Sequence, residues 1–102
     1  MRSNLILYLL RYETKPGAFS DEGERIAQKR RVYANSYGVS LDSSIRARRE
    51  GLRIAGRAEI YTFEYSNEED VEISGRVYRI LHTQTRGDKT IITYGEAIGD
   101  GN

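Results

Sequence analysis

The chain has 102 residues, a length expected for one domain with a single modest core. Sixteen Lys and Arg residues against fifteen Asp and Glu residues leave a formal charge of only +1, which argues against a dedicated nucleic-acid-binding protein with a wide basic face. The sequence contains no cysteine, which excludes disulfides and thiolate metal sites and fits a reducing cytoplasm.

The first predicted element is a buried strand over residues 5–14, "LILYLLRYET". Its apolar run covers six residues, whereas a membrane helix needs about 20. Arg2 followed by "LILYLL" resembles a signal peptide, but the apolar region ends at Arg11 without a cleavage site of small residues. We therefore expect no membrane association.

A loop and a second strand follow. Residues 15–24 hold the only proline, two glycines and three acids, which predicts a mobile loop near residues 14–25. A two-residue period then returns, with Val32 and Ala34 on one face and Tyr33 and Tyr37 on the other. This alternation predicts a strand that ends shortly after Tyr37.

Residues 40–52, "SLDSSIRARREGL", break the strand pattern and predict a short helix. Ser40 or Asp42 can cap its N-terminus, and Gly51 can end it. Such a short helix is marginal alone in water, so its apolar side is expected to dock on the sheet. The predicted docking residues, spaced by four and seven, are Leu41, Ile45 and Leu52. The surrounding segment, residues 39–56, is expected to be mobile.

The remainder predicts strands joined by tight turns. Residues 57–66 alternate as a third strand, residues 71–84 form a hairpin about Ser74 and Gly75, and residues 86–89 turn into a last strand. Residues 97–102 are expected to be a flexible tail. The predicted fold is a single domain over residues 1–102, mainly all-β: a small antiparallel β-barrel or sandwich of about six strands. One short helix lies between the second and third strands.

No motif for catalysis, a cofactor or a metal is present. His82 is the only histidine and has no nucleophile motif nearby. The acidic runs at residues 21–24 and 68–70 lack the spacing of a calcium loop and are interpreted as solvated loop charges. We therefore predict no catalytic, cofactor or metal site, and a protein that is not an enzyme.

The arginines of the helical segment are the candidate binding residues: Arg46, Arg48, Arg49 and Arg53. Three interpretations remain open. The arginines form a solvated helix face, a docking face for an acidic partner, or a contact with DNA phosphates.

The order and spacing of four stretches resemble the head-closure, or stopper, family of head–tail connectors of tailed bacteriophages and prophages of Gram-positive hosts. The stretches are "LRYET", "RRVYANSYGVSLDSSIRARREGL", "AEIYTFEY" and "VEISGRVYRILHTQTRGDKTIITYGE", and the resemblance covers about residues 5–96. Gly75, Tyr78 and Ile80 follow a pattern typical of this family. The helix departs from it, because relatives carry an acidic-aromatic-alanine turn there, whereas this chain has Asp42, Ile45 and Ala47 with extra arginine.

The resemblance implies a structural virion protein whose copies form a ring beneath the portal and adaptor rings. The connection between the second and third strands would face the channel and help to retain packaged double-stranded DNA, which would place Arg46, Arg48, Arg49 and Arg53 toward DNA or a neighbouring subunit's acidic edge. The implied partners are the adaptor and portal proteins, a tail-completion or tail-terminator protein, the DNA, and other copies of the chain. The protein would be a monomer in isolation, located in the host cytoplasm during assembly and then in the virion.

Two alternatives remain. One is a small-barrel nucleic-acid-binding module that uses exposed tyrosines as stacking platforms. The near-zero charge and the absence of basic residues beside most tyrosines count against it. The other is a tail-completion or adaptor protein of the same connector, with the same partners but without a channel segment.

Overall fold

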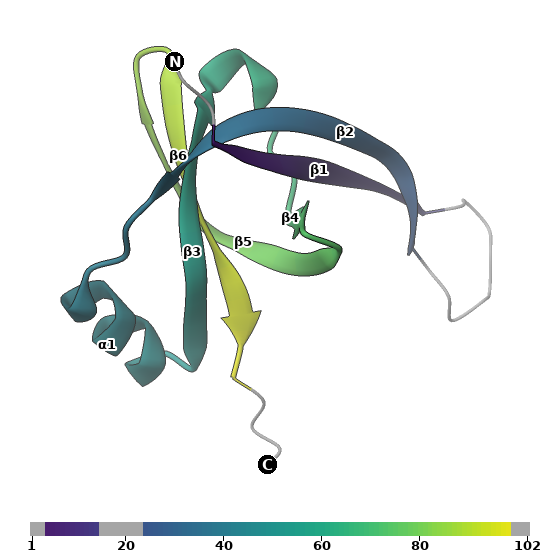
Figure 1. The fold of residues 1–102 in the computed structure, drawn as a ribbon. Coiled ribbons are helices and arrows are strands. Elements are labelled where there is room, and N and C mark those ends of the chain that lie inside the picture. Colours follow the sequence, from purple (N-terminus) through teal and green to yellow (C-terminus); the bar gives the residue numbers. More distant parts are fainter. Residues whose placement is uncertain (1–3, 15–23, 99–102) are drawn as a thin grey trace.

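A computed structural model describes residues 4–14 and 24–98. Its elements in chain order are β1 (Leu5–Thr14), β2 (Glu24–Tyr37), α1 (Leu41–Arg49), β3 (Leu52–Tyr61), the 3-10 turn η1 (Thr62–Glu64), β4 (Asp70–Ile73), β5 (Arg76–Arg86) and β6 (Lys89–Ala97) (Figure 1). The prediction of a mainly β chain with one short helix between its second and third strands is confirmed. Residues 15–23 of the predicted first loop and residues 99–102 of the predicted tail lie outside the described residues.

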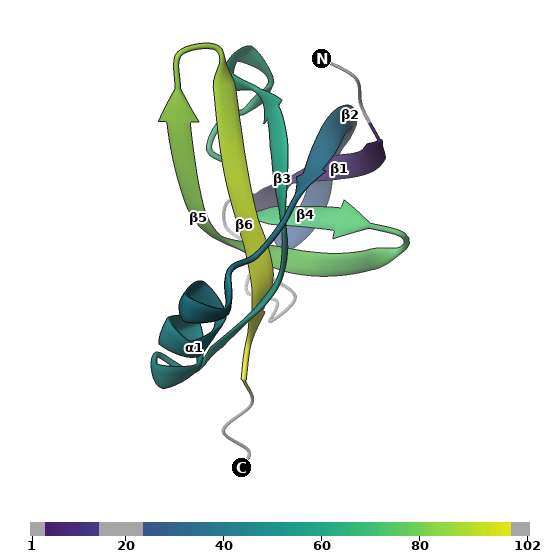
Figure 2. The same ribbon diagram turned by 60° about the vertical axis from the view of Figure 1, so that its left-hand side comes forward.

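The six strands form one antiparallel sheet in the order β1-β2-β3-β6-β5-β4. Strand β1 also pairs with β4, so the sheet closes on itself as a small barrel. Figure 2 shows the long β3, β5 and β6 strands side by side, with β1, β2 and β4 crossing beside them. Of the two architectures that the sequence left open, this is the closed one.

The closure is uneven around the sheet. Strands β1 and β2 pair along their whole shared length, but β1 meets β4 only at residues 8–10 and β2 meets β3 only at residues 35–37. The far half of the β1–β2 hairpin therefore projects away from the rest of the sheet (Figure 1). The other end of β2 leads directly into α1.

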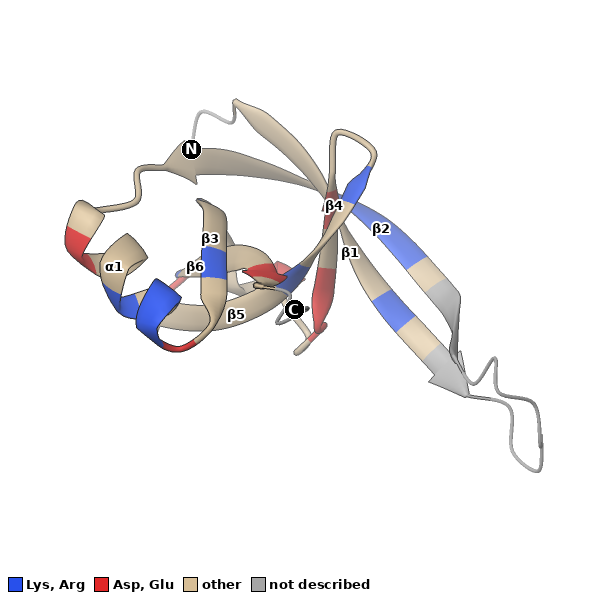
Figure 3. Ribbon diagram, turned by 90° about the horizontal axis from the view of Figure 1, so that it is seen from below, with Lys and Arg blue, Asp and Glu red and all other residues tan. Residues whose placement is uncertain are grey.

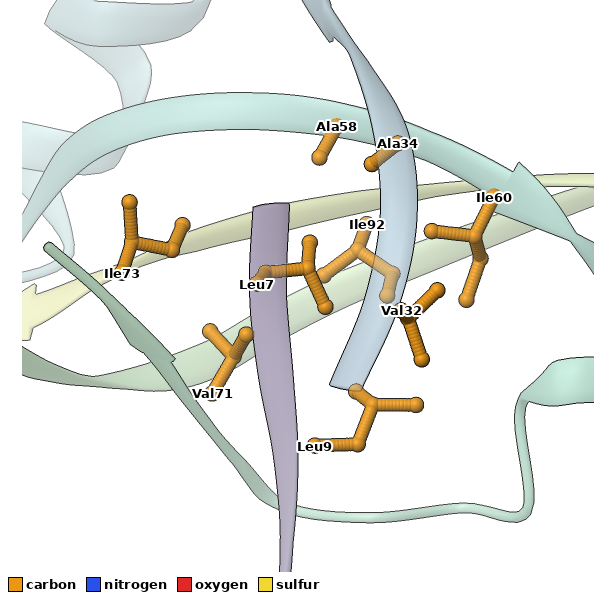
Figure 4. Packing of buried hydrophobic residues seen from close by; sticks show 9 residues of the cluster. All are labelled: Leu7, Leu9, Val32, Ala34, Ala58, Ile60, Val71, Ile73 and Ile92. Carbon is orange, nitrogen blue, oxygen red and sulfur yellow. The ribbon is translucent and has the colours of Figure 1, made fainter. Parts of the chain in front are cut away.

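The core consists of side chains that alternate along the strands and point inward, as the two-residue period requires. Its members are Leu7, Leu9, Val32, Ala34, Ala58, Ile60, Val71, Ile73 and Ile92 (Figure 4). The predicted shared face of Val32 and Ala34 is confirmed, since both are fully buried. Burial of each large aliphatic side chain contributes about 1.5–3 kcal/mol, so this small cluster supplies much of the stability.

The third strand begins and ends earlier than the predicted range of residues 57–66. Strand β3 starts at Leu52, directly after α1, because its first residues pair with the end of β6. It stops at Tyr61, where the Thr62 amide donates to the carbonyl of Asp88 and the chain turns into η1. The segment predicted to be mobile, residues 39–56, thus holds α1 and the first half of β3. Among the described helices, none is both long enough and apolar enough to cross a membrane.

Candidate functional site

Helix α1 has well-formed ends that hold it in place between β2 and β3. The Ser40 hydroxyl accepts a hydrogen bond from the Ser43 amide at 3.1 Å, which confirms the predicted N-cap. Gly51 has φ 78°, a left-handed conformation that glycine adopts without strain, and its amide donates to the Arg48 carbonyl at 3.0 Å. The Gly51 carbonyl accepts from the Ile98 amide at 2.8 Å, so the helix end is tied to the end of β6.

The predicted docking side of the helix is wrong. Leu41 is 74% exposed and Ile45 is 44% exposed, whereas Ala47 is buried. Leu52 belongs to β3 and is half-buried. On the side toward the sheet lie Ser43, Arg46 and Ala47 of the helix and the C-cap residue Glu50, because the short connections at both ends impose that orientation.

A groove of about 310 Å³ lies beneath α1. Its floor is apolar and consists of Leu52 and Ile54 from β3 and Leu81 from β5. His82 of β5 also lines it and is exposed. Among the described residues no group of three His, Asp or Glu side chains is placed to hold a metal ion.

The candidate arginines divide into two sets. Arg46, Arg48 and Arg49 are exposed and make no ion pair with any described residue. The Arg53 guanidinium instead lies 3.6 Å from the Glu96 carboxylate, which also pairs with Arg76 at 3.0 Å. Figure 3 shows the basic positions of the second half of α1 close together, interrupted only by Ala47. The structure thus brings three of the four predicted arginines together as unpaired cations.

The outer face of α1, defined as Leu41, Ile45, Arg48 and Arg49, combines aliphatic and cationic side chains. Residues 41, 45 and 48 are separated by four and three positions, so they lie one above another on the helix. Arg49 follows Ile45 by one turn. The side of the helix that points away from the sheet is therefore both apolar and positive.

The acidic run at residues 68–70 was interpreted from the sequence as solvated loop charges, and this interpretation is wrong for Glu68. We define the acidic segment as residues 64–72, which contains five carboxylates and no Lys or Arg. Glu68 is only 6% exposed, and its carboxylate lies 3.2 Å from Arg30 of β2 and 3.7 Å from Arg11 of β1. It also accepts from the Ser66 amide at 2.8 Å. No local signal predicts this cluster, because both arginines are distant in sequence.

Two carboxylates of the acidic segment have no ionic partner within the part of the chain that the structure describes. Glu72 pairs with Lys29 at 3.2 Å, and Asp70 accepts from the Tyr12 hydroxyl at 2.5 Å. Glu64 and Glu69 make no ion pair with any described residue. The pKa of Tyr65 is raised by burial and, to a smaller degree, by Glu68 and Glu69, which is consistent with a local excess of negative charge.

Phe63 lies in η1, immediately before this segment, and is 79% exposed. Its ring stacks on that of Tyr61 with centroids 5.5 Å apart, and the Lys89 ammonium lies 5.1 Å from the Tyr61 centroid. A large aromatic side chain exposed to solvent is a feature of interaction surfaces.

Basic side chains lie beside more tyrosines than the sequence indicated. Cations sit over the rings of five of the eight tyrosines in the pairs Lys29–Tyr8, Arg31–Tyr33, Arg57–Tyr37, Arg76–Tyr78 and Lys89–Tyr61. Two of the pairs, Arg31–Tyr33 and Arg76–Tyr78, join alternate residues of one strand, whereas the other three join different strands and cannot be seen in the linear order. One argument against a nucleic-acid-binding module is thereby removed.

No protein-family model matches the chain, and no curated protein sequence is significantly similar to it.

Proposed function

We propose that the chain is a structural protein of the head–tail connector of a tailed bacteriophage. Copies form a ring beneath the portal and adaptor, close the DNA channel after genome packaging and present a surface to the tail. The observation that carries this proposal is the helix between β2 and β3, which the closed sheet holds out with three unpaired arginines.

The physical logic depends on repetition. One copy carries a formal charge of only +1, so it has little general attraction for DNA. A ring places the same three arginines of every copy at one radius, where weak contacts with DNA or with the acidic edge of a neighbouring copy add together because the copies are held in one assembly. The sheet fixes the position of the segment between β2 and β3, and the side chains of that segment make the contacts. Binding residues commonly lie on such connecting segments, which a rigid scaffold positions.

Genome retention in filled heads tests this function. We expect that R46A/R48A/R49A lowers the fraction of heads that keep their DNA, since it removes the free cations while the core is untouched. The matched control is R31A/R79A/R86A, which removes three exposed arginines from β2 and β5. Retention that is equal in the two variants, with both proteins folded, would count against the proposal.

A small nucleic-acid-binding module is the second candidate, favoured by the cations over five tyrosine rings. Such a module would bind free single-stranded DNA as a monomer, with an affinity that falls steeply as salt rises. The connector protein would not bind appreciably before assembly. Titration of the purified monomer with a labelled oligonucleotide at two salt concentrations distinguishes the two.

A further inference from the structure

We propose that the outer face of α1 binds the acidic segment and Phe63 of a second copy of this chain, head to tail. This inference rests on the proposed function, because it names the partner that α1 meets when copies assemble.

The apolar part of α1 indicates a protein partner. A helix on the surface of a soluble protein normally turns its larger apolar side chains inward, whereas α1 buries Ala47 and exposes Leu41 and Ile45. Phosphate groups offer nothing to aliphatic side chains, so DNA accounts for the arginines alone. An acidic protein surface with an exposed apolar side chain would contact both the aliphatic side chains and the arginines of α1. Phe63 is the most exposed large hydrophobic residue among those described.

The charges of the two surfaces are complementary. On one side, Arg48 and Arg49 of the outer face, and Arg46 at the edge of the groove, have no ionic partner among the described residues. On the other side, the acidic segment carries more carboxylates than the nearby cations can pair. Arg11 and Arg30 pair with Glu68 and Lys29 pairs with Glu72, which leaves Glu64 and Glu69 without an ionic partner among the described residues. Opposite charges around apolar contacts favour this pairing and disfavour contact of either surface with itself.

The positions of the two surfaces require the contact to be between copies. In both Figure 1 and Figure 2, α1 lies at the lower end of the molecule and η1 at the upper end. The helix packs on β3 of its own chain and cannot reach its own acidic segment. Because each copy offers two different surfaces, the contact is heterologous and continues from copy to copy, which generates a ring when the rotation closes.

Cysteine cross-linking tests the contact, and the cysteine-free sequence makes it unambiguous. We expect that the variant I45C/F63C, concentrated and mildly oxidised, forms a ladder of disulfide-linked oligomers. I45C alone and F63C alone should stay monomeric, as should the control I45C/V77C, whose second exposed site lies outside both surfaces. The proposal is overturned by the absence of a ladder from I45C/F63C, or by dimers of I45C alone that show helix pairing with helix.

Charge exchange gives an independent measure. Both R46E/R48E/R49E and E64K/E69K, each placed in the I45C/F63C background, should lose the ladder by at least several-fold, and their combination in one chain should recover it. If α1 bound DNA phosphate instead, the combination would not recover any contact. Circular dichroism and thermal melting confirm that each variant is folded.

The two proposals fail separately. A missing ladder together with loss of DNA from R46A/R48A/R49A heads overturns the copy-to-copy contact and leaves the connector function. A clear ladder together with full DNA retention overturns the connector function and leaves the contact.

Discussion

Replacement of Glu68 by alanine should destabilise the fold more than replacement of any other carboxylate in the acidic segment. Its carboxylate is 3% exposed and joins Arg30, Arg11 and the Ser66 amide. Loss of one partner from a fully buried ion pair costs about 3–5 kcal/mol. The Arg30 and Arg11 side chains are 34% and 49% exposed, so water can solvate them again, and the expected cost falls to about 2 kcal/mol.

Urea titration and thermal melting of the purified chain measure this effect. A loss of about 2 kcal/mol corresponds to a fall in Tm of about 8–16 °C for a domain of this size. Glu69→Ala is the matched control, because its side chain is exposed and it should stay within about 0.5 kcal/mol of the parent. Glu68→Gln keeps an acceptor for the Ser66 amide and should fall between the two. Equal stabilities of Glu68→Ala and Glu69→Ala would refute the role of the buried carboxylate.

Two further predictions concern the sheet. Gly95→Ala places a methyl group against the backbone carbonyl of Arg53 on the paired strand, so urea titration should show a loss of more than about 2 kcal/mol in the free energy of unfolding. Gly38→Ala, which has open space around it, should change this free energy little. Similar effects of the two substitutions would contradict the packing of β3 on β6. Burial, with a smaller contribution from Tyr78, raises the pKa of Tyr94. The Tyr94 hydroxyl therefore loses its proton at lower pH in the unfolded chain than in the folded one, and stability should fall as the pH rises past about 10. Tyr94→Phe should flatten the dependence of Tm on pH between about pH 9 and 11, and an unchanged slope would refute this.

Local rules predicted much of the fold because they operate over a few residues. Alternation placed Val32 and Ala34 in the core, glycine marked the turn at Gly75, and Ser40 and Gly51 marked the ends of the helix. Each of these depends on backbone conformation or on the period of a strand, which the sequence carries directly.

Features that depend on contacts between distant segments could not be predicted in the same way. The helix has two candidate stripes, one through Leu41 and Ile45 and another through Ser43 and Ala47. Hydrophobicity favours the first, but the connections to β2 and β3 impose the second. Likewise, nothing in the sequence distinguishes Glu68 from its solvated neighbours. Only the pairing of distant strands brings Arg11 and Arg30 close to it.

The failed prediction about α1 is also the most informative one for function. A helix that keeps Leu41, Ile45, Arg48 and Arg49 outward, with neither arginine ion-paired to a described residue, has a surface that water alone does not explain. The proposed assembly gives that surface a partner.

For the connector function proposed above, the most direct measurement is a cryo-electron microscopy map of filled phage heads that contain this chain. The account predicts a ring of copies around the DNA channel, with residues 41–49 of each copy against Phe63 and the acidic segment of the next. A map in which this helix lies on the outer wall of the particle, in contact with no other copy, would contradict it.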